Sequence, residues 1–274
     1  MKKSVIILLL LLFVSSSFQL HAQDKVVPGK QIAIEHSFPN SQVDGFLLYL
    51  PQSYENRTKA YPLLMFLQGS AAVGGPVSGI AMGEIPMMLK EETDMSSRLN
   101  QILLDSFIVV CPHIRDGQYY EEEEVLREII SELKDTYRVD DRRIYLTGLS
   151  RGGMGSWGLA ESMSDIFAAV APMAGGVWMV ENFSSMKALS FWVAHANEDP
   201  SLAFPPIEEA VEKLEALGAD KFFRMNTAKT FSTEYLKHKN IFTIFERDIH
   251  NVWDDVYTST QFYTWLLRQR KNAD

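Results

Sequence analysis

The stretch YLTGLSRGGMG, residues 145–155, decides the fold of this chain. An apolar run, IYLT at 144–147, leads into it, and Ser150 lies between Gly148 and Gly152. This pattern predicts a strand that turns sharply into a helix, because glycines allow a tight turn that a side chain would block. Such a turn would expose the Ser150 hydroxyl at the end of the strand. A plain glycine-rich loop is the alternative.

Short apolar runs recur on both sides of this stretch and predict buried strands. They cover residues 45–50, 62–67, 107–111, 144–147, 167–172, 190–193 and 241–245. Amphipathic stretches between them predict helices over 122–137, 208–217 and 260–269. Because strands and helices alternate, we expect a doubly wound, mostly parallel α/β sheet with helices on both faces. Residues 69–98 predict a long functional loop, and residues 220–239 predict a helix with an excursion over the surface.

The composition is typical of a globular protein with a large core. Of 274 residues, 46% are hydrophobic and 22% are charged, and residues 23–274 are expected to form a single domain. The net charge of −9 argues against a nucleic-acid partner, because phosphate would be repelled. Cys111 is the only cysteine and predicts a buried thiol, not a metal site. Four glutamates at 121–124 predict a solvated first helical turn rather than a cation site.

Residues 1–22 differ in kind from the rest of the chain. A basic start precedes an apolar run from Val5 to Val14, and Leu20-His21-Ala22 follows. This order is typical of a secretory signal cleaved after Ala22, since the apolar run is too short to span a bilayer. We therefore expect export to the periplasm or the medium, with no stable membrane anchor after cleavage. An uncleaved anchor is the alternative.

Ser150 needs a neighbouring base, because a free serine hydroxyl is a weak nucleophile. On a sheet with this turn, the acid and then the histidine follow the serine along the chain. His250 comes after the last apolar run and opens a loop, so it is the predicted base; a structural histidine is the alternative. Asp199 follows the run 190–193 and is the predicted acid, with Glu198 as the second choice. Chemistry of this kind needs no metal and no cofactor.

Two backbone amides are expected to bind the oxyanion that forms during attack by Ser150. One is that of Arg151, which follows the nucleophile, and the other comes from the loop Gln68-Gly69-Ser70 after the run 62–67. Each such donor contributes about 3 kcal/mol to the transition state. Candidate substrate-binding side chains at the same edge are those of Gln68, Trp178 and Trp253. Tyr119 is a further candidate, although aromatic side chains commonly fill cores.

With these residues placed, the chain resembles the secreted α/β-hydrolase esterases. This group contains feruloyl and acetyl-xylan esterases, polyhydroxybutyrate depolymerases and predicted peptidases related to phospholipases and carboxylesterases. The resemblance covers most of the chain from about residue 45, and its clearest blocks are PLLMFLQGS (62–70), YLTGLSRGGMGSW (145–157), WVAHANEDP (192–200) and IHNVWDDVY (249–257). It implies the same triad of Ser150, Asp199 and His250 and an oxyanion donor at Ser70.

Three departures from the pattern of this group bear on function. Gln68-Gly69 and His195-Ala196 stand where the group usually has His-Gly, so the hydrogen bonds of the oxyanion loop are expected to be rewired. His195 itself, at a strand end, is expected to be structural. Arg151 stands where close relatives more often have methionine. Its side chain either favours acidic or polar substrates or forms a surface ion pair.

These observations predict an exported serine esterase that cleaves carboxylic esters. The expected substrates are small-molecule or polysaccharide esters, with feruloyl or acetyl groups linked to carbohydrate. A serine peptidase, or an esterase of lipids and short-chain esters, is the second hypothesis. The third is an inactive hydrolase-fold protein that binds glycans, which the departures at Gln68 and Ala196 keep open.

Overall fold

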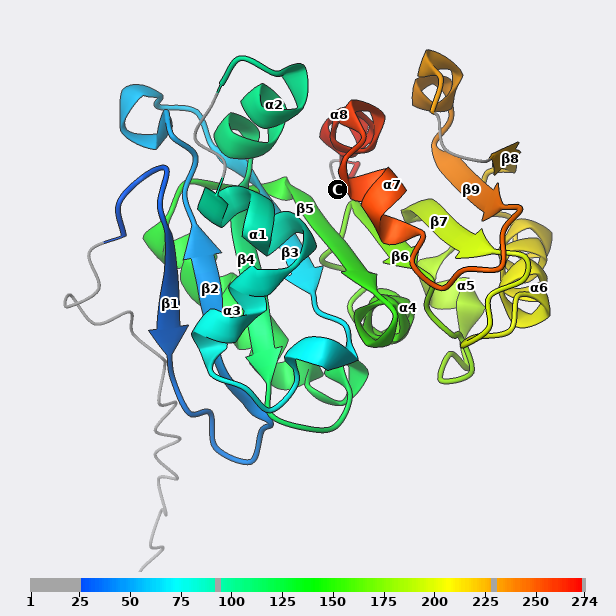
Figure 1. Ribbon diagram of the computed structural model, residues 1–274, viewed down its shortest axis with the longest axis horizontal. Coiled ribbons are helices and arrows are strands. Elements are labelled where there is room, and N and C mark those ends of the chain that lie inside the picture. Colours follow the sequence, from blue (N-terminus) through cyan, green and yellow to red (C-terminus); the bar gives the residue numbers. More distant parts are fainter. Residues whose placement is uncertain (1–25, 92–94, 228–230, 273–274) are drawn as a thin grey trace, which may run out of the picture.

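A nine-stranded sheet forms the centre of the computed structural model, which describes residues 26–91, 95–227 and 231–272 (Figure 1). The strand order is β1-β2-β4-β3-β5-β6-β7-β9-β8. β2 runs antiparallel to both of its neighbours, whereas every pair from β4·β3 to β9·β8 is parallel. The predicted signal at residues 1–22 lies outside the described residues.

The strands and helices alternate along most of the chain, as the hydrophobic pattern predicts. The strands are β1 (Gln31–Glu35), β2 (Val43–Tyr49), β3 (Tyr61–Leu67), β4 (Ile108–Ile114), β5 (Val139–Leu149), β6 (Ala169–Met173), β7 (Ser190–Ala196), β8 (Phe222–Thr227) and β9 (Asn240–Phe245). The helices are α1 (Glu84–Glu91), α2 (Arg98–Ser106), α3 (Glu123–Thr136), α4 (Arg151–Ser162), α5 (Phe183–Met186), α6 (Pro205–Ala216), α7 (Trp253–Tyr257) and α8 (Thr260–Arg268).

The sheet separates two hydrophobic cores, because successive side chains of a strand point to opposite faces. In β3, Leu63, Met65 and Leu67 pack with apolar residues of α3, α4, α5 and α6, whereas Leu64 and Phe66 pack with those of α1, α2, α7 and α8. β3, β6, β7 and β9 are buried along their whole length. The predicted doubly wound, mostly parallel sheet with helices on both faces is therefore confirmed.

Three local predictions were wrong or incomplete. Residues 220–239 contain the edge strand β8 and a short 3-10 turn, Thr233–Lys237, instead of a helix with an excursion. Residues 69–98 contain two 3-10 turns and α1 within the expected loop. Of the four glutamates at 121–124, Glu122 is buried and accepts hydrogen bonds from Ser41 Oγ and the Gln42 amide, so this turn is only partly solvated.

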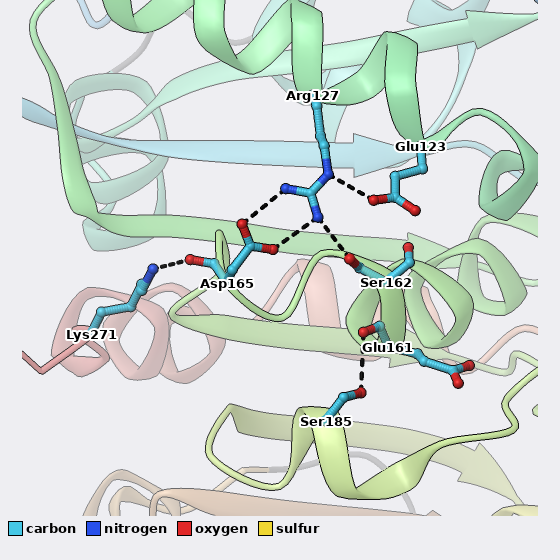
Figure 2. A network of polar contacts seen from close by, with 7 residues as sticks. All are labelled: Glu123, Arg127, Glu161, Ser162, Asp165, Ser185 and Lys271. Atoms are coloured by element: carbon cyan, nitrogen blue, oxygen red, sulfur yellow. Dashed lines mark hydrogen bonds and ion pairs between the residues drawn. The ribbon is translucent and has the colours of Figure 1, made fainter.

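A polar network ties α3 to the end of α4 (Figure 2). The Arg127 guanidinium donates to both carboxylate oxygens of Asp165, at 2.9 and 3.0 Å, and to the Ser162 carbonyl, at 2.7 Å. Its Nε donates to Glu123 Oε1, at 2.7 Å, one turn earlier on α3. This network holds the two helices together at their solvent side.

Two further findings concern the thiol of Cys111 and the character of the helices. Cys111 lies buried in β4, as predicted, and burial raises the pKa of its thiol well above the usual range. In the part of the chain that the structure describes, no helix has the length and apolar character needed to cross a membrane.

Candidate active site

Ser150 lies at a sharp turn between β5 and α4, where the glycine pattern predicts it. Its φ of 51° and ψ of −112° are strained for a residue with a side chain. A Cβ at Gly148 would lie 2.4 Å from the Gly152 carbonyl oxygen, and one at Gly152 would lie 2.1 Å from the Leu67 carbonyl oxygen. Glycine is therefore required at both positions, because β5, α4 and the end of β3 approach one another at backbone distance.

The structure brings Ser150, His250 and Asp199 together at the ends of three strands. Ser150 Oγ lies 2.9 Å from His250 Nε2, and His250 Nδ1 lies 2.7 Å from Asp199 Oδ2. The Asp199 side chain is fully buried, whereas that of His250 is 22% exposed. A hydrogen-bonded series of this kind allows a histidine to take a proton from a serine hydroxyl while the carboxylate stabilises the imidazolium that forms.

Asp199 is held by backbone amides and by a second histidine. Its Oδ1 accepts hydrogen bonds from the amides of Ser201, at 2.7 Å, and Leu202, at 3.0 Å. His195 Nε2 lies 2.9 Å from the Leu202 carbonyl oxygen and 3.5 Å from Asp199 Oδ2. Burial lowers the pKa of His195, which favours a neutral ring that donates its Nε2 proton to Leu202. Glu198, the second choice for the acid, is exposed and takes no part in this series.

A cavity of about 470 Å³ opens beside Ser150. Its lining contains Gln68, Gly69, Ser70, Ala71, Ala72, Gly79, Ile80, Gly83, Glu84, Leu149, Ser150 and Trp253. The Arg151 amide is the first of α4, so it has no carbonyl partner within the helix. Ser70 lines the cavity, and Arg151 comes directly after the lining residue Ser150.

Two of the three candidate substrate-binding side chains line this cavity. Gln68 is buried, and its Nε2 donates to the Ile80 carbonyl at 2.8 Å, which ties the loop after β3 to the 3-10 turn Val77–Met82. The Trp253 ring meets His250 edge to face, with centroids 5.2 Å apart. Trp178 is 66% exposed and does not belong to the lining.

Two other candidates point away from the cavity. Tyr119 is buried, and its hydroxyl donates to the Pro112 carbonyl, so it belongs to the core and the hypothesis of a ligand-binding role is wrong. The Arg151 guanidinium donates to the Gly117 carbonyl and lies 3.9 Å from Asp116 Oδ1, with 14% of its side chain exposed. This placement favours the ion-pair interpretation of Arg151 over a contact with acidic substrates.

Sequence reasoning missed two groups near the cavity. Glu84, the first residue of α1, lines it and accepts a hydrogen bond from Trp253 Nε1 at 3.0 Å. His113, buried in β4, lies 2.5 Å from Asp44 Oδ1 through Nδ1 and 3.1 Å from the Ala72 carbonyl through Nε2. Both residues lie in stretches that the resemblance covers, GEIPMML (83–89) and SFIVVCPH (106–113), but Glu84 looks like any first-turn acid and His113 like any strand histidine, so neither was singled out.

Comparison with known proteins identifies the architecture. No family model matches the chain. A solved thermostable esterase has a TM-score of 0.68 at 23% identity, over 88% of this chain and 64% of that one. The feruloyl esterase module from Clostridium thermocellum, complexed with sinapinate, has a TM-score of 0.63 at 14% identity, over 91% and 92%. The chain has the α/β-hydrolase fold.

Two curated relatives match this chain over part of its sequence. A poly(3-hydroxyalkanoate) depolymerase C of Paucimonas lemoignei is 35% identical over 51 residues, 19% of this chain. A bifunctional acetylxylan esterase/xylanase of Neocallimastix patriciarum is 27% identical over 113 residues, 38% of this chain. The matches span 12% and 16% of these relatives. The resemblance predicted from the sequence is confirmed, because the neighbours include feruloyl esterases, an acetylxylan esterase and this depolymerase.

Proposed function

We propose that this α/β-hydrolase is a serine esterase that cleaves carboxylic esters. The observation that carries the proposal is the series of hydrogen bonds from Ser150 through His250 to Asp199 beside an open cavity. A buried carboxylate, a partly exposed imidazole and a strained serine are the parts that nucleophilic catalysis at an acyl group requires. The esterases among its structural neighbours support the same reaction class.

The reaction has two halves. Ser150 Oγ attacks the ester carbonyl carbon and its proton passes to His250 Nε2, which gives a tetrahedral oxyanion. His250 then donates this proton to the leaving alcohol as the carbon–oxygen bond breaks, and an acyl-serine remains. Water attacks the acyl-serine, His250 takes one of its protons and returns it to Ser150 Oγ, and the carboxylic acid leaves. Asp199 stabilises the imidazolium in both halves.

The amides of Arg151 and Ser70 bind the oxyanion in this mechanism. In support, Ser70 belongs to the cavity lining, and the Arg151 amide follows Ser150 at the start of α4, where it has no carbonyl partner within the helix. The hydrogen bond from Gln68 to the Ile80 carbonyl holds the loop after β3 in place. Gln68 stands at a position where the esterases that this chain resembles usually have histidine. Preorganised donors are effective because they need no rearrangement when the charge develops.

The substrates in this proposal are carbohydrate-linked esters with an acetyl or feruloyl acyl group. The cavity lining is mainly apolar, with Ile80, Leu149 and the Trp253 ring, which suits a small acyl chain or an aryl ring. The named neighbours include a feruloyl esterase complexed with sinapinate and an acetylxylan esterase. Export through the signal at residues 1–22 belongs to the same proposal, since polysaccharide substrates lie outside the cell.

Labelling with a fluorophosphonate tests the proposed chemistry without knowledge of the substrate. We expect a stable adduct on Ser150, located by peptide mass spectrometry. Ser150→Ala abolishes the adduct, and Ser185→Ala on α5 leaves it intact. A folded protein that takes no label would contradict the proposal and favour an inactive hydrolase fold. Once labelling is seen, hydrolysis of acetyl- and feruloyl-carbohydrate esters identifies the acyl group.

A further inference from the structure

The sequence suggests a positive charge near the nucleophile, at Arg151, whereas the cavity itself carries a negative one. The guanidinium of Arg151 lies against Gly117 and Asp116, away from the lining. Among the described residues that line the cavity, Glu84 is the one with an acidic or basic side chain. A substrate that enters beside Ser150 therefore meets a carboxylate.

Glu84 is fixed in this position by the backbone and by one hydrogen bond. It begins α1 with a φ of 47°, a left-handed value that is unusual for a residue with a side chain. Oε1 accepts from Trp253 Nε1 at 3.0 Å, and no residue in the described ranges donates to Oε2. One carboxylate oxygen thus anchors the side chain, and the other retains its capacity to accept a hydrogen bond.

Trp253 links Glu84 to the histidine that gives its proton to the leaving alcohol. His250 must hand its proton to that alcohol, so the alcohol passes close to the imidazole. The Trp253 ring packs edge to face on this imidazole, and its Nε1 holds Glu84. Glu84 and the proton donor thus both contact the Trp253 side chain.

We propose that Glu84 selects esters by the charge of their alcohol. It disfavours anionic alcohols and favours neutral hydroxyl-rich or cationic ones, because its carboxylate repels the former and accepts hydrogen bonds from the latter. The inference rests on the proposed esterase function and narrows its substrate class to esters of neutral sugars, as opposed to those of uronic acids.

The electrostatic surroundings of Glu84 add a pH signature. Burial and the neighbouring Asp254 raise the pKa of Glu84, and the Trp253 hydrogen bond opposes this rise. The other titratable groups facing it are His250 beyond the indole and Tyr257, whose hydroxyl stays neutral because burial raises its pKa. Selection against anions should therefore fade as the pH falls and Glu84 becomes protonated.

Three aryl acetates whose alcohols carry different charges test the inference, and comparing their ratios between variants cancels their other differences. They are phenyl acetate, 4-acetoxybenzenesulfonate and 4-acetoxyphenyltrimethylammonium, which share one acyl-enzyme, so kcat/KM reports the step in which the alcohol leaves. Glu84→Gln keeps the size and the acceptor for Trp253 and removes the charge. We expect the anionic-to-neutral ratio of kcat/KM to rise about tenfold and the cationic-to-neutral ratio to fall, as for one charge at roughly 10 Å.

Glu91→Gln, at the exposed end of the same helix, removes an equal charge and should leave both ratios unchanged. In the wild type the anionic-to-neutral ratio should rise toward low pH, and in Glu84→Gln it should be flat. A purely structural Glu84 would change kcat/KM for all three esters alike, which would overturn the inference. If the enzyme hydrolyses phenyl acetate but both kcat/KM ratios are the same in Glu84→Gln and the wild type, only the role of Glu84 is overturned. No hydrolysis and no fluorophosphonate label overturn the esterase proposal and this inference with it.

Discussion

At the scale of single residues, the site depends on a serine held in a conformation that suits glycine. Ser150 has a φ of 51°, and the backbones of Gly148 and Gly152 pack so closely around it that the turn cannot relax. Strain of this kind costs about 1–3 kcal/mol and persists only where the surrounding structure imposes it. It aims the hydroxyl at His250 and exposes it to the cavity.

This strain predicts an inverted stability order for two variants of Ser150. Ser150→Ala removes the hydroxyl and keeps the strained backbone, whereas Ser150→Gly also relieves the strain. We expect Ser150→Gly to be more stable than Ser150→Ala by about 1 kcal/mol, although glycine is ordinarily the less stable of the two. Chemical denaturation of both variants measures the difference. A more stable alanine variant would show that the turn is not strained.

At the scale of elements, the loop after β3 is held in place by a hydrogen bond to a side chain of the neighbouring strand β4. His113 connects Asp44 of β2 to the Ala72 carbonyl, and Gln68 connects the same loop to Ile80. The loop contains Ser70, which is the expected oxyanion donor. Its position therefore depends on a buried histidine in a neighbouring strand as well as on its own glycines.

His113→Ala should lower kcat/KM for phenyl acetate by about tenfold, because a displaced loop misplaces one oxyanion donor. It should also lower the free energy of unfolding by about 2–3 kcal/mol, since Asp44 loses its partner. Arg127→Met is the matched control, because it breaks the network of Figure 2 far from the cavity lining. We expect Arg127→Met to reduce stability with unchanged kcat/KM. Equal kcat/KM in His113→Ala and the wild type would refute the role of His113.

At the scale of the whole molecule, the parallel sheet gathers groups from distant parts of the chain at one edge. Ser150 follows β5, Asp199 follows β7 and His250 follows β9, and β5, β6, β7 and β9 are neighbours in the sheet. His195 near the end of β7 supports this edge from inside the core. Folding must therefore bury this imidazole, which makes global stability sensitive to pH.

His195 predicts how stability changes with pH. Burial lowers the pKa of His195 in the folded state below its unfolded value of about 6.5. The contribution of His195 to the free energy of unfolding is therefore complete above pH 6.5, and it is lost as the pH falls from there through the folded pKa. His195→Gln keeps a donor for the Leu202 carbonyl and removes the titration. We expect the variant to lose less free energy of unfolding than the wild type between pH 7.5 and pH 5. Parallel pH profiles in urea denaturation would exclude this role.

The sequence alone predicted the seven central strands and the amphipathic helices α3, α6 and α8. It could do so because strands buried on both faces are apolar along their length, and because strand and helix periods differ. The edge strands β1 and β8 were missed, since their alternating or mixed burial gives no continuous apolar run. The Ser150 turn was predictable because a close backbone approach requires glycine at fixed positions.

The sequence by itself determined three features of this protein: the sheet, the turn that holds Ser150, and the order of the serine, the acid and the histidine along the chain. These depend on local patterns and on the rule that parallel strands end at one edge. Only the tertiary structure decided the charge of the cavity and the support of its loop. The Arg151 side chain lies away from the cavity, whereas Glu84 lines it. The physical reason is that a side chain's direction depends on packing partners far along the chain, as Glu84 and Trp253 or His113 and Ala72 show.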